Sequence, residues 1–292
     1  MKVAIYQTSW GSATAGIEPF LERAQDSGFD GVEVFMPDPT TALARLAEER
    51  GLDLLGHIYS TGGDSAAHVA FLREAYLRAI DCGPRLVNCQ TGRDHFSFDN
   101  NLRIFEAAAD LVRDHGVAIH HETHRSRPTF SIPATLKLLR ALPDLTLTLD
   151  LSHWMVVHES DLRDQQATLD EILGHARHLH ARVGHAEGPQ VPDPRDEAWH
   201  PERARHLDLW RSVVQRRATG GDEHLTITTE FGPAPYLPAE PFSGKPVADQ
   251  WAINVFVRDW LRTELVHVTG EGERPIMSGT PDSPTPPARP PA

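Results

Sequence analysis

Short apolar runs alternate with longer amphipathic segments from the start of the chain to about residue 265. The runs have the length and the Val, Ile and Leu content of buried strands. Eight of them occur, at residues 3–6, 31–35, 53–58, 85–90, 117–122, 145–150, 178–182 and 225–230. Strands that alternate with helices form parallel sheets, and eight such units close a barrel. The pattern therefore predicts an α/β chain with a single (β/α)8 TIM barrel.

The segments between these runs carry the periodicity of helices that cover a sheet. One apolar stripe, which Gly28 ends, consists of Ile17, Phe20, Leu21 and Ala24. Further helices are expected across residues 72–79 with Asp64 or Ser65 as a cap, across 104–112, from near Ser131, and over about 247–265. Segments 184–201 and 231–246 are rich in Pro or Gly and follow strands, where barrel enzymes carry their functional loops.

The composition changes after the last predicted helix. The segment GEGERPIMSGTPDSPTPPARPPA is rich in Pro, Ser, Thr and Gly and poor in residues that build a core. We therefore expect a barrel domain over residues 1–266 and a disordered tail over residues 267–292.

Composition and charge narrow the classes of partner. The chain has no run of eighteen apolar residues, and its N-terminus enters a strand-like segment directly, so we expect a cytoplasmic protein without a membrane partner. The formal net charge of -13 repels polyanions, and nucleic acid is therefore not expected as a partner. A small neutral or metal-chelated substrate fits better. Cys82 and Cys89 are too few for a disulfide framework and are expected to be reduced.

Four of the later strands end in a potential metal ligand. These residues are Glu122 in IHHE, Asp150 in LTLD, His180 in HLH and Glu230 in ITTE. Strand ends of a parallel barrel converge on one face, so distance in sequence does not keep these side chains apart. A single acidic residue at such a position is equally well interpreted as a helix cap or a solvated loop residue. Four potential ligands at the ends of four successive strands favour a shared metal site.

The donor types of this set indicate the ion. Three carboxylates and one imidazole suit one divalent ion, with Mn or Mg favoured and Co or Zn possible. Three unpaired carboxylates are costly to bury together, and a divalent cation offsets most of their charge. We therefore predict one metal ion held by Glu122, Asp150, His180 and Glu230.

Five motifs resemble the xylose isomerase-like superfamily of sugar isomerases, epimerases and apurinic endonucleases. They are GFDGVEVF at 28–35, ETH at 122–124, LDLSHW at 149–154, HLH at 178–180 and TEFGP at 229–233. The resemblance covers about residues 1–265 and implies that the same four residues hold the metal. It also implies that Glu122 and Glu230 act as catalytic residues, exchanging protons with a sugar or a small hydroxy-carbonyl compound through a metal-stabilised enediolate. The implied activity is that of an isomerase or epimerase.

Six residues are candidates for substrate binding. The resemblance implies this role for His153, while His57 and Gln90 end the third and fourth predicted strands near the mouth of the barrel. The full set consists of His153, His57, Gln90, His185, Glu187 and Trp10. Packing remains the favoured interpretation for Trp10, and also for Trp154.

Three further charged residues lie near these positions and are candidates for supporting the site or for binding an anion. Glu33 in GVEVF is expected at the same barrel end, where it would orient a ligand histidine through a hydrogen bond. Arg125 and Arg127 follow the first predicted ligand glutamate, and they are candidates for binding a carboxylate or phosphate. A solvated loop is an equally good interpretation for both arginines.

Other functions stay open at this stage. A metal-dependent lyase or dehydratase acting on a sugar, cyclitol or keto-glycoside needs the same first proton transfer. An AP-endonuclease-like phosphodiesterase is disfavoured by the net charge and by Gln90. The resemblance implies a histidine at this position, the end of the fourth strand, in the endonuclease branch. A non-catalytic binding barrel is disfavoured because the whole ligand set is present. The resemblance is compatible with a homo-oligomer.

Overall fold

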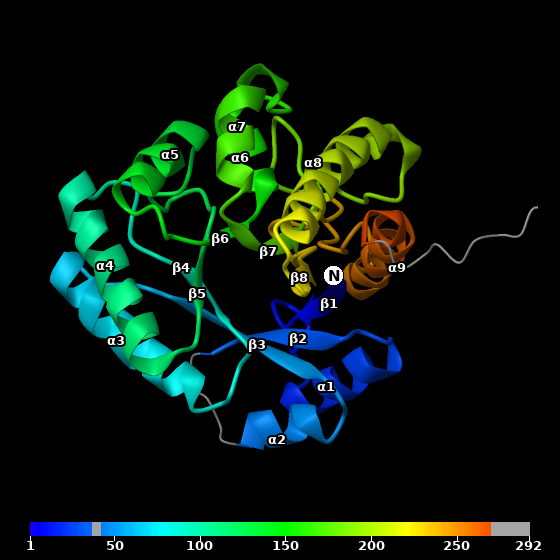
Figure 1. Ribbon diagram of the computed structural model, residues 1–292. Coiled ribbons are helices and arrows are strands. Elements are labelled where there is room, and N and C mark those ends of the chain that lie inside the picture. The colour runs from blue at the N-terminus through cyan, green and yellow to red at the C-terminus, as the bar shows by residue number, and fades with distance from the viewer. Residues whose placement is uncertain (37–41, 270–292) are drawn as a thin grey trace, which may run out of the picture.

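The computed structural model describes residues 1–36 and 42–269 and shows a closed barrel of eight parallel strands (Figure 1). Each strand pairs with its neighbours in chain order, and the last strand pairs with the first, as Tyr6 does with Thr228. The α/β TIM barrel predicted from the sequence is thus confirmed. The strands are β1 (Lys2–Thr8), β2 (Gly31–Phe35), β3 (Asp53–Tyr59), β4 (Val87–Gln90), β5 (Ile119–Glu122), β6 (Leu147–Leu149), β7 (Ala176–Ala181) and β8 (His224–Thr229).

Helices form the outer ring of the barrel (Figure 1). They are α1 (Ile17–Asp26), α2 (Ala42–Glu48), α3 (Ser65–Ile80), α4 (Phe98–His115), α5 (Ile132–Ala141), α6 (Leu151–His158), α7 (Gln166–Leu173), α8 (His200–Thr219) and α9 (Gln250–Thr269). Short 3-10 turns at Arg163–Gln165 and Glu197–Trp199 precede α7 and α8. None of the helices in the described ranges is long and apolar enough to cross a bilayer.

The predicted helix starts agree with the observed caps. Asp64 accepts a hydrogen bond from the Ala67 amide at 2.9 Å, and Ser131 accepts one from the Ala134 amide at 3.3 Å. The connection between β6 and β7 contains two helices, and α8 begins inside the segment expected to be a loop. The predicted domain boundary after residue 266 falls in the last turn of α9, and residues 270–292 of the predicted tail lie outside the described residues.

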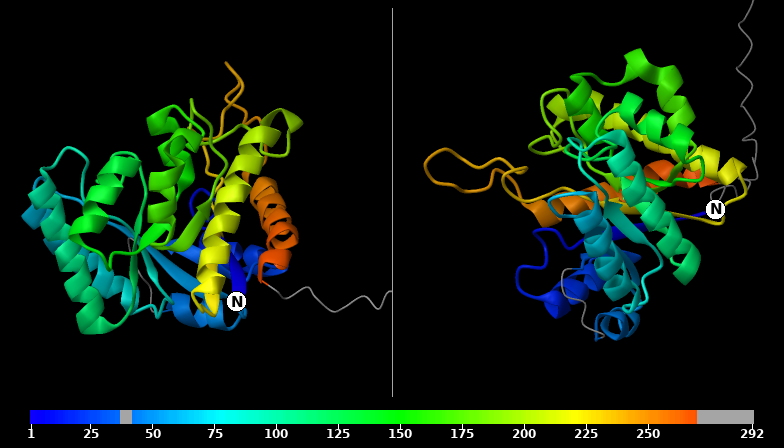
Figure 2. Two further views of the ribbon diagram at one scale, coloured as in Figure 1. Left: turned by 45° about the horizontal axis from the view of Figure 1, so that its top comes forward. Right: turned by 90° about the vertical axis from the view of Figure 1, so that its left-hand side faces the viewer.

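The segment between β8 and α9 extends beyond the strand ends, as the orange loop in Figure 2 shows. Its start is tied to the loop after β7, because the Gln190 side chain donates to the Gly232 carbonyl at 3.1 Å and accepts from the Gly232 amide at 2.7 Å. Two long loops are therefore held together above one end of the barrel, which is the end where the chemistry-bearing side chains gather.

The opposite end of the barrel interior is tightly packed. Tyr6 belongs to a small apolar cluster inside the barrel, and its hydroxyl donates to Asp53 at 2.8 Å. Gly31 lies against both residues: a Cβ there would stand 2.3 Å from the Asp53 carbonyl oxygen and 2.5 Å from a Tyr6 ring carbon. Only a glycine leaves room for the ring at this position.

We predict that Gly31→Ala destabilises the barrel. The added methyl would overlap a backbone oxygen that cannot move without breaking the sheet, so the free energy of unfolding should fall by about 1–3 kcal/mol. Gly174→Ala is the matched control, because Gly174 has helical backbone angles and a Cβ there meets its nearest atom at 3.7 Å. Denaturant unfolding followed by circular dichroism measures both. Equal stability of the two variants would contradict this account of the packing.

Candidate metal centre

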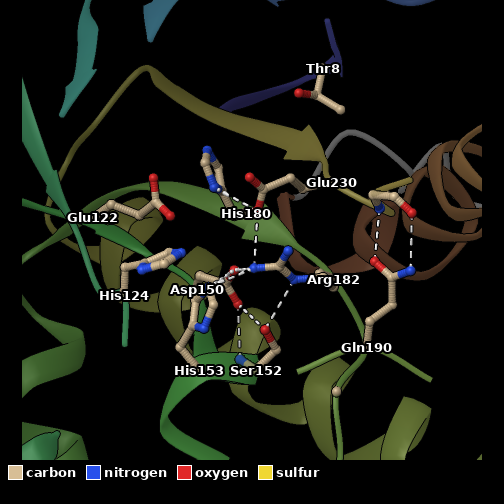
Figure 3. A network of polar contacts seen from close by, with 12 residues as sticks. Thr8, Glu122, His124, Asp150, Ser152, His153, His180, Arg182, Gln190 and Glu230 are labelled. Carbon is tan, nitrogen blue, oxygen red and sulfur yellow. Dashed lines mark hydrogen bonds and ion pairs between the residues drawn. The ribbon is translucent and has the colours of Figure 1, made fainter. Parts of the chain in front are cut away.

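The structure brings the four predicted ligands together at the carboxyl ends of the strands (Figure 3). Glu122 ends β5, Asp150 caps α6 directly after β6, His180 lies in β7, and Glu230 follows β8. One nitrogen or oxygen atom from each lies within 4.8 Å of the others. All four are buried, with exposed fractions of 1% for Glu122, 0% for Asp150, 1% for His180 and 5% for Glu230.

Asp150 is held by its own helix and by one arginine. Its Oδ1 accepts hydrogen bonds from the Ser152 amide at 2.9 Å and the Ser152 hydroxyl at 2.5 Å, while its Oδ2 accepts one from Arg182. Burial raises the pKa of Asp150 and Arg182 lowers it, and with the nearby Glu230 carboxylate the net result is a pKa of about 6. The buried carboxylate is therefore only partly compensated by its protein partners.

The His180 ring is oriented by a carboxylate below it. Its Nε2 lies 3.1 Å from both oxygens of Glu33, and because a carboxylate only accepts, Nε2 carries the hydrogen. Its Nδ1 faces Glu230 Oε2 at 2.9 Å, yet neither atom has a hydrogen-bond partner of acceptable geometry within the described residues. Burial lowers the pKa of His180, but Glu230 and Glu33 outweigh it and raise the pKa well above its usual value. A positive charge is favoured at this point.

Glu33 connects several side chains beneath the ligand set, as expected from the sequence. Besides His180, it contacts His57 Nδ1 at 3.0 Å and His178 Nε2 at 3.2 Å, and it accepts from the Thr228 hydroxyl at 2.5 Å. Burial raises the pKa of Glu33, but His180 and the hydrogen bonds from the histidines lower it well below its usual value. Glu33 is thus a buried anion that supports the ligands from inside the barrel.

Glu122 is held by two amide side chains. Asn88 donates to Glu122 Oε2 at 2.9 Å, and Gln90 donates to Oε1 at 3.2 Å. The Gln90 Oε1 atom accepts a hydrogen bond from Arg127 at 3.3 Å, and Arg127 also donates to the Gly92 carbonyl at 2.8 Å. Gln90 therefore positions Glu122. Arg127 in turn holds Gln90 in place and has its guanidinium engaged by the protein, so it is not free to bind an anion.

Three other predicted substrate contacts lie around the ligand set. His153 stands beside Asp150, and its Nε2 accepts from Arg182 at 2.8 Å. His57 lies deeper, with Nε2 3.6 Å from Glu122 Oε2. Trp10 forms part of the wall above, where the Arg182 guanidinium lies 5.8 Å from its ring centroid. Trp154, in contrast, is fully buried and donates to the Thr129 carbonyl, in agreement with the packing interpretation.

The structure does not bring His185 and Glu187 to the ligand set. The chain turns sharply after β7, where His185 forms an isolated bridge with Gly188 and its ring lies 5.0 Å from that of Trp199. Glu187 is exposed. Within the described part of the chain, neither side chain contacts any of the four predicted ligands.

Several residues of the centre were not identified from the sequence. Asn88, His178 and Thr228 each stand two positions before a residue that was identified, and Arg182 stands two positions after His180. Alternate residues of a strand point to the same side, so the period of two was the signal that places them inside the barrel. Their partners come from distant strands and are not visible in any local pattern.

Two further donor groups share members with the four-residue set. Glu122, His124 and His153 form one, and Glu33, His178 and His180 form the other. Glu33 already accepts hydrogen bonds from both histidines of its group, and the His124 Nδ1 donates to the Arg125 carbonyl. The four-residue set has three carboxylates, whereas each of the other groups has one, so it is the better candidate for a hard divalent ion.

The residues of this set fit a divalent cation. His180 Nδ1 and Glu230 Oε2 are buried, face each other at 2.9 Å without a hydrogen bond, and are both atoms that can bind a metal. Three carboxylates with one imidazole form a hard to borderline site. Including Glu33, four buried carboxylates lie here, and Arg182 is the one arginine in the described part of the chain that forms an ion pair with any of them. A divalent cation would offset that excess of negative charge.

Comparisons with known proteins agree with the fold. The model of the xylose isomerase-like TIM barrel family matches residues 21–218. An L-ribulose 3-epimerase superimposes with a TM-score of 0.64 at 16% identity, over 96% of this chain and all (100%) of the other. The probable 3-DHS dehydratase AsbF of Bacillus anthracis gives 0.57 at 18% identity, over 80% of this chain and 94% of the other.

A third similar structure is that of an endonuclease, whose reaction differs from those of the epimerase and the dehydratase. The family 2 AP endonuclease of Brucella melitensis superimposes with a TM-score of 0.56 at 17% identity, over 89% of this chain and 98% of the other. No curated protein matches the chain in sequence. At these identities the solved structures establish the fold alone.

We predict that Glu33→Gln weakens divalent cation binding by about 10–100-fold, because a neutral amide no longer fixes the His180 tautomer. Mn²⁺ binding followed by electron paramagnetic resonance measures the affinity. Glu187→Gln is the matched control, since Glu187 is exposed and remote from the ligand contacts. Equal affinity of wild type and Glu33→Gln would show that Glu33 does not support a cation site.

Proposed function

The chain belongs to the family of xylose isomerase-like TIM barrels, and we propose that it is a metal-dependent isomerase or epimerase of a sugar or small hydroxy-carbonyl compound. The similar folds include an epimerase, a dehydratase and an endonuclease, so they support an enzyme without choosing its reaction. The proposal is carried by Glu122 and Glu230, two buried carboxylates that approach one point from different strands (Figure 3).

The residues that would hold the cofactor are the four of the candidate centre, with Mn or Mg favoured by the carboxylate-rich donors. A bound divalent ion would polarise the substrate carbonyl and thereby make the neighbouring C–H bond more acidic. The remaining steps belong to side chains of the chain itself.

The Glu230 side chain is held in its ionised form, which can accept a proton. Burial raises its pKa, but His180 and Arg182 outweigh this and lower the pKa to about 2. Glu122 is held in place by the two amide donors described above, which leaves its carboxylate oriented toward the same point. Two such groups on different strands satisfy the geometric requirement for taking a proton from one side of a carbon and returning one from another.

The proposed reaction conserves protons. One glutamate, ionised at the start, accepts the proton from the carbon next to the carbonyl, and the other, which starts as the carboxylic acid, donates its proton to the substrate. Return to the former carbonyl carbon, together with transfer of the hydroxyl proton to the former carbonyl oxygen, gives an aldose–ketose isomer. Return to the opposite face of the same carbon gives an epimer. The paired carboxylates then regain their starting protonation state by exchange with solvent.

His153 is suited to position the substrate. Arg182 donates to its Nε2, so the hydrogen of the neutral ring lies on Nδ1, and that atom has no partner within the described residues. Burial lowers the pKa of His153 well below its usual value, which keeps the ring neutral. A buried Nδ1–H without an acceptor is a donor for a substrate oxygen.

The test is proton exchange in heavy water. The metal-loaded protein is incubated with a panel of aldoses and ketoses, and deuterium at carbon is followed by NMR and mass spectrometry. We expect deuterated isomers or epimers, and a loss of about 10²–10⁴-fold in rate for Glu230→Gln, since the amide cannot accept a proton. Glu187→Gln should keep the wild-type rate.

Two results would count against this function. Loss of water or of a leaving group in place of isomer formation would identify a lyase or dehydratase. Exchange at an unchanged rate in Glu230→Gln would remove this carboxylate from the proton transfer.

A further inference from the structure

Arg182 has hydrogen-bond donors that nothing in the described chain uses. Its Nη2 contacts Asp150 and His153, and its Nε donates to the Ser152 hydroxyl at 3.1 Å. The other terminal nitrogen, Nη1, has no partner among the described residues, and Figure 3 shows it without a dashed line. The side chain is only 2% exposed, so these N–H groups reach little bulk solvent.

A second guanidinium lies next to the first across one aromatic ring. The Tyr236 ring centroid is 4.9 Å from the Arg182 guanidinium carbon and 5.1 Å from that of Arg125. Arg125 is half-buried and forms no ion pair with any carboxylate that the structure describes. Arg127, in contrast, is engaged with backbone carbonyls and Gln90. Arg125 is therefore the arginine of the loop after β5 whose guanidinium contacts only the Tyr236 side chain and forms no ion pair within the described residues.

The charge of Arg182 is paired with Asp150 and lies 3.5 Å from Glu230 Oε2, whereas the charge of Arg125 has no ion-pair partner among the described residues. A cation–π contact offsets only part of the cost of leaving that charge unpaired. The chain as a whole carries a net charge of -13, yet no carboxylate in the described ranges approaches Arg125. Guanidinium groups with free N–H pairs are the side chains best suited to bind a carboxylate or phosphate through two hydrogen bonds.

We propose that Arg125, Arg182 and Tyr236 form a binding site for the anionic group of the substrate. The ligand is therefore a sugar acid or sugar phosphate, and its carboxylate or phosphate lies beside the Tyr236 ring. This inference rests on the proposed function, because Arg182 also contacts Asp150 and lies 3.5 Å from Glu230 Oε2, which places the anion next to the reacting end of the substrate. Trp10 forms a second wall against the Arg182 guanidinium.

Calorimetry with simple anions tests the site without any turnover. Inorganic phosphate and acetate are titrated separately into the Mg²⁺-loaded protein, so that the two sources of anionic oxygen are distinguished. We expect Arg125→Leu to weaken binding of the preferred anion by about 10-fold or more. Arg125→Lys should weaken it less, because lysine keeps the positive charge but lacks the two parallel N–H donors of the guanidinium group. Circular dichroism confirms that the variants fold.

Arg73→Leu is the matched control, since Arg73 is an exposed arginine of α3 away from the barrel mouth. It should bind both anions as the wild type does. Equal anion affinity of Arg125→Leu and Arg73→Leu would overturn the proposed site. Binding of neither anion to the wild-type protein would overturn it as well.

A second measurement separates this inference from the proposed function. Deuterium exchange is compared on two neutral compounds, fructose and dihydroxyacetone, and on two compounds whose anionic group lies close to the carbonyl, dihydroxyacetone phosphate and a 2-keto-aldonate. Arg125→Leu should lower kcat/KM on an anionic compound by about 10-fold or more relative to its effect on a neutral one. Exchange on both kinds, insensitive to Arg125→Leu, would refute the anion site alone. Anion binding that depends on Arg125, without exchange on any compound, would refute the proposed reaction for these compounds alone.

Discussion

The burial of four carboxylates at one end of the barrel is the constraint on which the site depends. Glu33, Glu122, Asp150 and Glu230 are each 5% exposed or less, and Arg182 is the arginine that contacts this group. Charges of one sign repel strongly in a poorly hydrated interior, so the remaining charge requires protons or a cation. The raised pKa values of His180 and His57 are consequences of that demand.

The barrel solves this problem by dividing the carboxylates between two levels. Glu33 is satisfied from within by Thr228 and three histidines, so it acts as a fixed negative charge below the site. The other three carboxylates meet above it. Asn88 and Gln90 hold Glu122, Ser152 and Arg182 hold Asp150, and Glu230 Oε2 has no hydrogen bond within the described residues. The rigid sheet keeps these positions close together, which favours a bound ion over rearrangement.

The sequence allowed the fold and the four central residues to be predicted because both depend on strand ends. In a parallel barrel every strand ends on the same face, so Glu122 and Glu230 meet although they are far apart in the chain. Proximity along the chain was a poorer guide: His185 follows His180 closely, yet the turn at Gly188 directs it to Trp199. The fixed position of Gln90 depends on Arg127 from another loop, which no local pattern reveals.

The central claim is that Glu122, Asp150, His180 and Glu230 together bind one divalent ion. Anomalous diffraction from crystals grown with Mn²⁺ tests it most directly, because the signal locates the ion without reference to activity. The account predicts one strong peak with all four side chains as ligands. A peak between Glu122, His124 and His153 instead, or no peak at the four residues under saturating Mn²⁺, would contradict it.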